Sequence, residues 1–347
     1  MIYTKRVIYS LAFLILILKL QAQIPFGYYD SAIGKKDATL KTALFNIIKN
    51  HTQLEYYASA TYFRSTDWNP GGYFWDMYSN NKRSTWTSAL NREHNLPKSW
   101  WSTSPETTVA YSDLHNLYPS DATANGAKSN YPLGEVSGTP VFTNGAVKVG
   151  TNNFQGYNGT VFEPGDEYKG DFARDYMYVV TCYENYASNW RSTGTSSMLY
   201  NNTYPVFKTY AVNLLLKWHR NDPVSEKETK RNNAVYSIQN NRNPFIDYPA
   251  LAEYIWGDLK GTYWDGLATV SDLSFYVNYD NQTESVFVNV SANKSSNYSI
   301  YSVGGVLVKT GLTDHSQVIN INTLDKGLYL IVVYTETTRH MAKFHIW

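Results

Sequence analysis

The hydrophobic pattern of this chain changes near residue 266, from mainly helical spacing to the alternation of strands, which indicates two domains of different class. After Asp37, a candidate helix N-cap, apolar residues recur at helical spacing and share one face: Leu40, Leu44, Ile47 and Ile48. Further on, apolar residues alternate with polar ones, as strands require: Val286, Val288 and Val290. We therefore expect an α+β protein, with a helix-rich body at residues 23–265, an all-β domain at residues 272–347 and a boundary between residues 266 and 272.

Proline, glycine and helix-capping residues indicate where the elements of both parts begin and end. In the body, we expect a helix from Pro205 to His219, and another that begins after Asp222-Pro223 and runs to Gln239. The Gly-, Asn- and Ser-rich stretch at 134–159 predicts loops or short hairpins. In the tail, a Gly304-Gly305 turn and a strand from Gly327 predict a small β-sandwich.

The first 22 residues have the pattern of a secretory signal peptide. Lys5 and Arg6 precede an apolar run, Leu11–Leu18, and Ala22 follows at a small-residue cleavage point. A transmembrane anchor is the alternative, but the uncharged run is shorter than the roughly 20 residues that a spanning helix needs. We expect a secreted or cell-surface protein.

Cysteine usage then limits how such a protein is stabilised. Cys182 is the single cysteine, so no intramolecular disulfide can form, and we expect it to be buried. Stability must come from packing, for which the chain offers 31 tyrosines and 10 tryptophans.

The charge balance excludes one way of binding nucleic acid. The 347 residues carry 30 Lys plus Arg against 29 Asp plus Glu, a net charge of +1, so there is no large positive excess for counterion release. Anion binding would have to be local, through a patch or a bound cation. One group of cations is a candidate phosphate track, with a solvated helix face as the alternative: Lys217, Arg220, Lys227, Lys230, Arg231 and Arg242.

The most informative segment is NREHNLPKSW at 91–100. Its Glu93 and His94 put a hard-metal ligand beside a group that titrates near neutral pH. Adjacent side chains of a regular strand point to opposite faces, so both serve one site only if the strand ends there. Pro97 makes such a break plausible because it disfavours helix in Leu96.

A second segment, DLHNLYPSDATANGAKSN at 113–130, predicts a short strand and then a helix. Pro119, Ser120 and Asp121 are suited to open that helix. Strand, loop, strand and helix would bring His94 and Asn125 to one place, where the Asn amide oxygen can bind Mg²⁺ or Ca²⁺ without adding charge. The pattern fits a single-metal phosphodiesterase.

These two segments, with VFEPGDEYKGDFARDYMYVVTCY at 161–183 and LLKWHRNDPVSEKETKRNNAVYSIQNNRNPFIDYPALAEYIW at 215–256, closely resemble the endonuclease I family. The resemblance implies a ββα-metal (His-Me finger) site in which His94 is the general base and Glu93 and Asn125 hold the metal. It implies a secreted endonuclease cleaving DNA, and possibly RNA, with 5′-phosphate products. Tyr111 stands where some members have Glu.

Further assignments complete the expected site. Candidate substrate-binding residues are Lys128, where the family often has Arg, and Arg92, His115 and Asn116, although His115 also fits a structural role. Mg²⁺ is the expected ion, with Ca²⁺ or Mn²⁺ as alternatives, whereas zinc usually requires three ligands rich in His or Cys. We expect a monomer with little sequence specificity, since no groove-reading motif is visible.

The tail carries a second resemblance. Its last segment, LDKGLYLIVVYTETTRHMAKFHIW, resembles the C-terminal sorting domain of the type IX secretion system. That implies an outer-membrane secretion machinery as partner, and the alternative is a carbohydrate-binding or adhesive module. For the whole protein, two alternatives stay open: a family member that prefers RNA, or a catalytically silent surface-binding protein.

Overall fold

The computed structural model describes residues 24–25, 27–190, 198–266, 275–280, 285–290, 296–313, 316–334 and 339–346. The chain divides into two compact units, residues 1–266 and 267–347, and each is described by itself. The signal peptide predicted at 1–22 lies outside the described residues. Among those described, no helix has the length and apolarity needed to cross a membrane.

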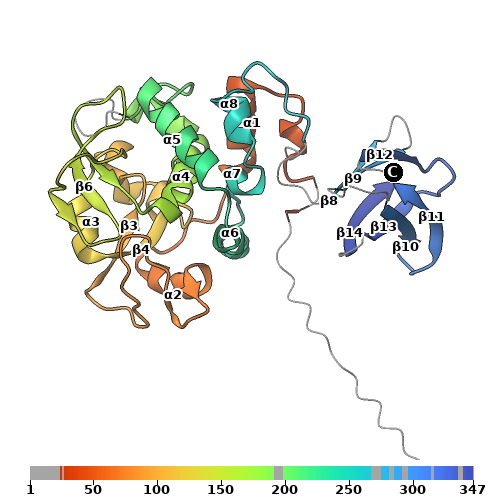
Figure 1. The fold of residues 1–347 in the computed structure, drawn as a ribbon, viewed down its shortest axis with the longest axis horizontal. Coiled ribbons are helices and arrows are strands. Elements are labelled where there is room, and N and C mark those ends of the chain that lie inside the picture. Colours follow the sequence, from red (N-terminus) through yellow and green to blue (C-terminus); the bar gives the residue numbers. More distant parts are fainter. Residues whose placement is uncertain are drawn as a thin grey trace, which may run out of the picture. The chain divides into compact units, whose positions relative to one another are not determined.

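The first unit is built around one buried helix. Its helices are α1 (Asp37–Ile48), α2 (Ser59–Thr66), α3 (Ala122–Lys128), α4 (Lys169–Cys182), α5 (Thr209–Asn221), α6 (Glu226–Gln239), α7 (Pro244–Asp247) and α8 (Leu251–Ile255). Every residue of α4 after Lys169 is buried, and α4 packs against α1, α5 and α7 (Figure 1). Helix α4 is therefore the core element of this unit.

The expected helices exist, but their starts differ from prediction. Helix α1 begins at Asp37 with Lys36 as N-cap, one residue earlier than expected. Helix α6 is capped by Ser225, not Asp222, because Ser225 and Glu228 form a reciprocal capping box. Helix α5 begins at Thr209, since the residues before it form a β-bridge instead, Leu199 with Phe207.

The strands of the first unit form three small antiparallel sheets. They are β1 (Trp68–Asn69) with β2 (Tyr73–Phe74), β3 (Leu90–His94) with β4 (Leu117–Asp121), and β5 (Phe142–Thr143) with β6 (Lys148–Thr151) and β7 (Thr160–Glu163). The short hairpins predicted within 134–159 are confirmed by β5 and β6.

Aromatic packing fills the core, as the composition predicts. The largest fully buried side chains include Trp100, Trp101, Trp190, Trp218 and Trp264. Burying a large apolar side chain contributes roughly 1.5–3 kcal/mol. Cys182 is buried and forms no disulfide, as expected. A smaller cluster underlies β3 and β4: Phe63, Phe74, Leu90, Leu114, Leu117 and Val235.

The second unit is all-β. A four-stranded sheet has the order β11 (Leu307–Thr313), β10 (Ser296–Ser302), β13 (Gly327–Tyr334), β14 (Arg339–Ile346), and a three-stranded sheet has the order β12 (Ser316–Asn320), β9 (Ser285–Val290), β8 (Phe275–Asp280). All pairs are antiparallel. The two sheets share one hydrophobic core, which includes Val286, Ile300, Ile319 and Ile331. This is the arrangement of a β-sandwich, and Gly305 makes the predicted turn with a φ of 80°.

Candidate active site

Two antiparallel strands followed directly by a helix carry the candidate site. In the β3–β4 pair, Glu93 lies opposite Tyr118. Asp121 ends β4 and caps α3, since its carboxylate accepts hydrogen bonds from the backbone N–H groups of the second and third helix residues at 3.0 and 2.9 Å. The prediction that Pro119 and Ser120 open this helix is wrong, because both pair within β4, where a two-stranded sheet tolerates the missing N–H of proline.

The strand break after His94 is held by Asn116. The Asn95 N–H donates to the Asn116 carbonyl at 2.9 Å. The Asn116 side chain accepts from the Leu96 N–H at 2.8 Å and donates to the Leu96 carbonyl at 3.1 Å. Strand β3 includes both Glu93 and His94 and ends at His94, so the break follows the pair and does not fall between its two residues.

The imidazole of His94 has one nitrogen in a hydrogen bond and one without a partner among the described residues. Nε2 lies 2.8 Å from the carbonyl oxygen of Tyr111, which can only accept, so Nε2 carries the proton. In the neutral ring Nδ1 then carries the lone pair, for which the described residues offer no hydrogen-bond partner, and His94 as a whole is 5% exposed. Burial lowers the pKa of His94 to about 4, against the opposing effect of the Tyr111 carbonyl. The ring is therefore a neutral base at physiological pH.

Aromatic rings hold the plane of that imidazole. The Tyr111 ring stacks on His94 with a centroid distance of 5.1 Å, and Tyr56 lies parallel to it at 5.9 Å. Trp101 meets the imidazole edge-on at 5.7 Å. Tyr111, which stands where some relatives have Glu, thus contributes a backbone acceptor and a stacking ring. Tyr56 comes from the 3-10 helix Tyr56–Ala58 and gave no signal in the sequence.

Glu93 is largely buried and paired. Its Oε1 accepts a hydrogen bond from the Lys128 ammonium at 2.6 Å, and Lys128 is fully buried. Burial raises the pKa of Glu93, although the Lys128 charge acts in the opposite direction. Lys128 therefore supports Glu93 in this structure, and its burial does not support the substrate contact predicted for it.

The oxygen donors expected to hold a metal fit a hard divalent cation. Asn125 lies three residues before Lys128 on α3, so both share the helix face that meets Glu93. The Asn125 side chain is partly exposed and makes no side-chain hydrogen bond to the described residues. Carboxylate and amide oxygens suit Mg²⁺ or Ca²⁺.

Two cations border the site. Lys98 is partly exposed, forms a 3.4 Å ion pair with Glu106, and lies 5.0 Å from the centre of the Tyr111 ring. It follows Pro97 in the informative segment, yet sequence reasoning missed it. Arg92 donates to Ser59 Oγ at 2.7 Å and to the Tyr57 carbonyl at 2.8 Å, and so anchors that neighbouring segment.

His115 belongs to a buried structural network. Its Nε2 lies 3.2 Å from the Asn241 carbonyl, and burial lowers its pKa to about 3. Neighbouring Asp113 accepts from Gln239 at 2.6 Å and from the Tyr178 hydroxyl at 2.7 Å. A substrate-binding role is not supported for His115 or for Asn116, which are both sealed inside; the structural alternative stated for His115 agrees with these contacts.

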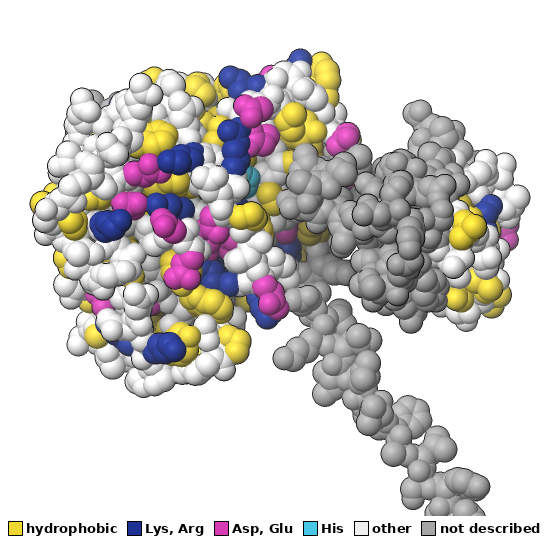
Figure 2. All heavy atoms as spheres, viewed as in Figure 1, with side chains coloured by type: hydrophobic (Ala, Val, Ile, Leu, Met, Phe, Trp, Pro, Cys, Tyr) yellow, Lys and Arg dark blue, Asp and Glu magenta, His cyan; other side chains and the backbone are white. Residues whose placement is uncertain are grey.

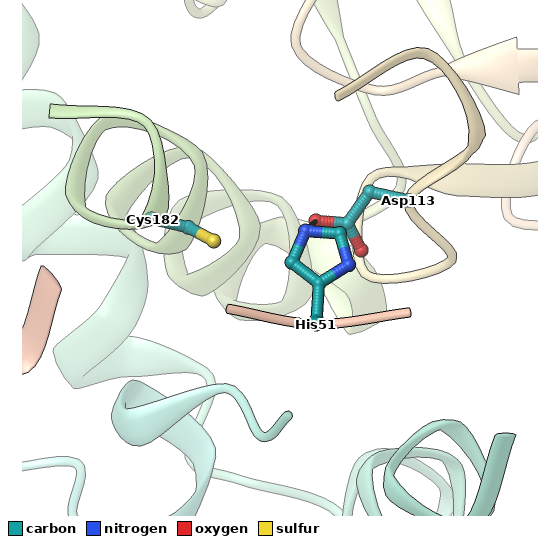
Figure 3. Close-up of side chains that lie close together, drawn as sticks. All are labelled: His51, Asp113 and Cys182. Carbon is teal, nitrogen blue, oxygen red and sulfur yellow. Dashed lines mark ion pairs between the residues drawn. The ribbon is translucent and has the colours of Figure 1, made fainter. Parts of the chain in front are cut away.

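The same network contains a group whose atom types could hold a metal: His51, Asp113 and Cys182. One ligand atom from each lies within 4.8 Å of the others (Figure 3). Their hydrogen-bonding capacity is already used, since the Tyr183 hydroxyl bonds both His51 Nε2 at 2.9 Å and Asp113 Oδ2 at 2.6 Å. An ion bound there would have to displace these hydrogen bonds.

The cations of the candidate phosphate track, at residues 217–242, are all engaged in ion pairs. Each of its cations has a carboxylate partner: Lys217 with Glu135, Arg220 with Glu253, Lys227 with Asp171, Lys230 with Glu226, Arg231 with Asp67 and Arg242 with Asp247. Arg231 and Arg242 are also buried. Figure 2 shows both signs of charge intermixed over the visible face. These contacts do not support a phosphate track, and they agree with the alternative of a solvated helix face for the exposed cations.

Comparison with known sequences agrees with this arrangement. Residues 37–250 match the family described as Endonuclease I. The chain belongs to the endonuclease I family. It is accordingly a nuclease that hydrolyses phosphodiester bonds, with nucleic acid as substrate, and the family is in general metal-dependent.

Curated relatives extend the match. The chain is 33% identical to an extracellular ribonuclease of Bacillus amyloliquefaciens over 237 residues, which cover 66% of this chain and 78% of that protein. It is 34% identical over 242 residues to an extracellular ribonuclease of Bacillus subtilis (strain 168), with the same coverage. Endonuclease-1 of Buchnera aphidicola is 25% identical over 136 residues, 39% of this chain and 44% of that protein.

The second unit has its own match. Residues 282–346 match a secretion system C-terminal sorting domain. Together with the extracellular relatives of the endonuclease I domain, this identifies a secreted or cell-surface protein whose tail engages a secretion machinery. The resemblance predicted from the final strands is confirmed.

Proposed function

We propose that this protein is a secreted, divalent-metal-dependent endonuclease that cleaves DNA and RNA with little sequence specificity, acting as a monomer through a ββα-metal site formed by β3, β4 and α3. One observation carries the proposal: the Tyr111 carbonyl fixes Nε2 of His94, so in the neutral ring Nδ1 carries the lone pair that can act as base.

His94 is the proposed general base. Nδ1 takes a proton from water as the water attacks phosphorus, and the resulting imidazolium keeps its Nε2–H bond to the Tyr111 carbonyl, whose dipole stabilises the new charge. The aromatic rings that flank His94 hold the orientation of its imidazole, and therefore the direction of the Nδ1 lone pair. We propose that Lys98, which is partly exposed, exchanges its ion pair with Glu106 for a phosphate near the base.

Glu93 and Asn125 are the proposed metal ligands. A divalent cation held there would stabilise charge on the phosphoryl and departing oxygens as a Lewis acid. Mg²⁺ is the proposed ion because two protein oxygen donors leave positions for water, which this ion releases reluctantly. Lys128 is proposed to hold the Glu93 carboxylate in place through their ion pair.

The substrate proposal draws on two sources. The family is described as Endonuclease I, and two relatives carry the name extracellular ribonuclease. We propose activity on both polymers. Preference for RNA is the second candidate and is favoured by those two names.

The decisive experiment compares wild type with His94→Ala on supercoiled DNA, single-stranded DNA and structured RNA, with magnesium and with EDTA. Loss of a general base should lower kcat by roughly 10²–10⁴-fold, and EDTA should abolish wild-type cleavage. Equal rates for the two proteins would refute the role of His94. Equal inactivity of both proteins would favour the catalytically silent alternative.

A further inference from the structure

A cleft opens beside the candidate base and has not been assigned a role. Its volume is about 490 Å³, and Tyr56, Tyr57 and Tyr111 line it; we call it the tyrosine cleft. Sites for organic ligands commonly measure roughly 300–1,000 Å³. The volume therefore admits a planar organic group.

The rings of the tyrosine cleft form a continuous path to His94. Tyr56 stacks on Tyr111 with a centroid distance of 4.3 Å, and Tyr57 meets Tyr56 edge-on at 5.3 Å. Tyr56 and Tyr111 both face the imidazole. The Tyr57 side chain ends the path and is 80% exposed, so a face of its ring is free for a ligand.

The charged residues around the cleft suit two different parts of a nucleotide, the base and the phosphate. The Arg92 guanidinium lies 5.6 Å from the Tyr56 ring centre and 5.8 Å from that of Tyr57, and Lys98 lies over Tyr111. Glu55 and Glu106 line the cleft itself. Carboxylates repel a phosphate but accept hydrogen bonds from amino groups of bases. The cleft thus suits a base, while the cations beside it suit the backbone.

We propose that the tyrosine cleft binds an unpaired nucleobase next to the cleaved phosphate, with Tyr57 as the stacking platform. This inference rests on the proposed function and specifies its substrate as single-stranded or locally unpaired nucleic acid. A base inside a duplex presents only its edges, whereas an unpaired base can stack on an aromatic ring. The cleft should therefore favour single strands over duplexes of the same sequence.

The test measures kcat/KM on a labelled single-stranded oligonucleotide and on the same sequence in a duplex. Stacking on one aromatic side chain changes affinity by roughly 5- to 150-fold, so Tyr57→Ala should lower the ratio of single-strand to duplex kcat/KM at least about fivefold. Tyr57→Trp should retain the ratio. Tyr263→Ala is the matched control, since Tyr263 is 61% exposed and does not line the cleft.

An unchanged ratio in Tyr57→Ala, or an equal fall in Tyr263→Ala, would overturn the proposal. Failure of the catalytic proposal is distinguishable because binding can be followed without cleavage. In the His94→Ala background with magnesium, fluorescence anisotropy should show that Tyr57→Ala weakens binding of the single strand by a similar factor. Equal binding with and without Tyr57 would contradict the tyrosine cleft even if wild type proved inactive.

Discussion

At the scale of single residues, the candidate site is defined by which atoms are already engaged. The Tyr111 carbonyl occupies one nitrogen of His94, and the Lys128 ammonium occupies one oxygen of Glu93. Two positions have no partner among the described residues: His94 Nδ1, which is suited to proton transfer, and the Asn125 amide, which is suited to a hard cation. The chemistry follows from these free positions rather than from residue identity alone.

Glu93→Gln tests the metal ligand. Removing the carboxylate charge should raise the magnesium concentration needed for half-maximal cleavage at least about tenfold, since carboxylates dominate the binding of this ion. Activity is titrated with magnesium for wild type, Glu93→Gln and Glu226→Gln, whose carboxylate pairs with Lys230 on the surface.

An unchanged titration for Glu93→Gln would remove Glu93 from the ligand set. Because this variant leaves the Lys128 charge buried without its partner, circular dichroism at the assay temperature must first show that it is folded.

At the scale of elements, α6 holds the start of strand β4 in place through the side chain of Arg231. The Arg231 guanidinium pairs with Asp67 at 2.8 Å and donates to the carbonyl oxygens of Leu114 and Leu117 at 2.7 and 2.9 Å. The guanidinium carbon of Arg231 also lies 3.8 Å from the centre of the Tyr118 ring. Arg231, one of the candidate phosphate contacts, instead fixes the start of β4.

Two adjacent residues of α6 provide a matched test of that role. Arg231→Ala should lower the free energy of unfolding by about 3–5 kcal/mol, because it leaves a buried carboxylate and two carbonyl groups unpaired. Lys230→Ala should cost about 0.5 kcal/mol or less, since its pair with Glu226 is exposed. Urea denaturation measures both. Equal losses would show that the buried contacts of Arg231 are not the reason for its position.

At the scale of the whole molecule, neutral histidines are buried in several elements. In α5, His219 lies 3.0 Å from the Pro249 carbonyl, and burial, aided by the Arg174 charge, lowers its pKa to about 4. An unfolded chain protonates this residue near pH 6.5. Between those values the unfolded state binds the additional proton, so stability falls as pH falls.

His219→Gln isolates this contribution to stability. The difference in unfolding free energy between wild type and the variant should be largest at pH 7.5 and should shrink by about 2 kcal/mol by pH 5, at about 1.4 kcal/mol per unit below pH 6.5. Urea denaturation at both pH values provides the measurement. A constant difference would show that His219 titrates alike in the folded and unfolded states.

The two units have separate hydrophobic cores, which predicts separable functions. A variant lacking residues 267–347 should cleave nucleic acid after purification, with kcat within about twofold of wild type, because the candidate site lies wholly in the first unit. In its native host the same variant should not reach the medium. Export of the shortened protein would contradict a sorting role for the tail, and loss of cleavage would contradict independence of the first unit.

Much of this fold could be read from local patterns. Periodicity located α1 and the strands of the tail, and proline and capping signals located α5 and α6, because both kinds of signal depend on neighbouring residues alone. The exact first residues of the helices were harder to predict. Ser225 rather than Asp222 caps α6, because Ser225 forms a reciprocal capping box with Glu228, and this depends on the local backbone conformation.

By itself the sequence determined the family, the two-part organisation and the segments that carry Glu93, His94 and Asn125, because those properties reside in contiguous motifs. Only the tertiary structure decided which charges are free. It paired Lys128 with Glu93 and Arg231 with Asp67, and it brought Tyr56 beside His94. The physical reason is that a buried charge must find a partner, and that partner lies wherever the packed chain places it, which can be far away in sequence.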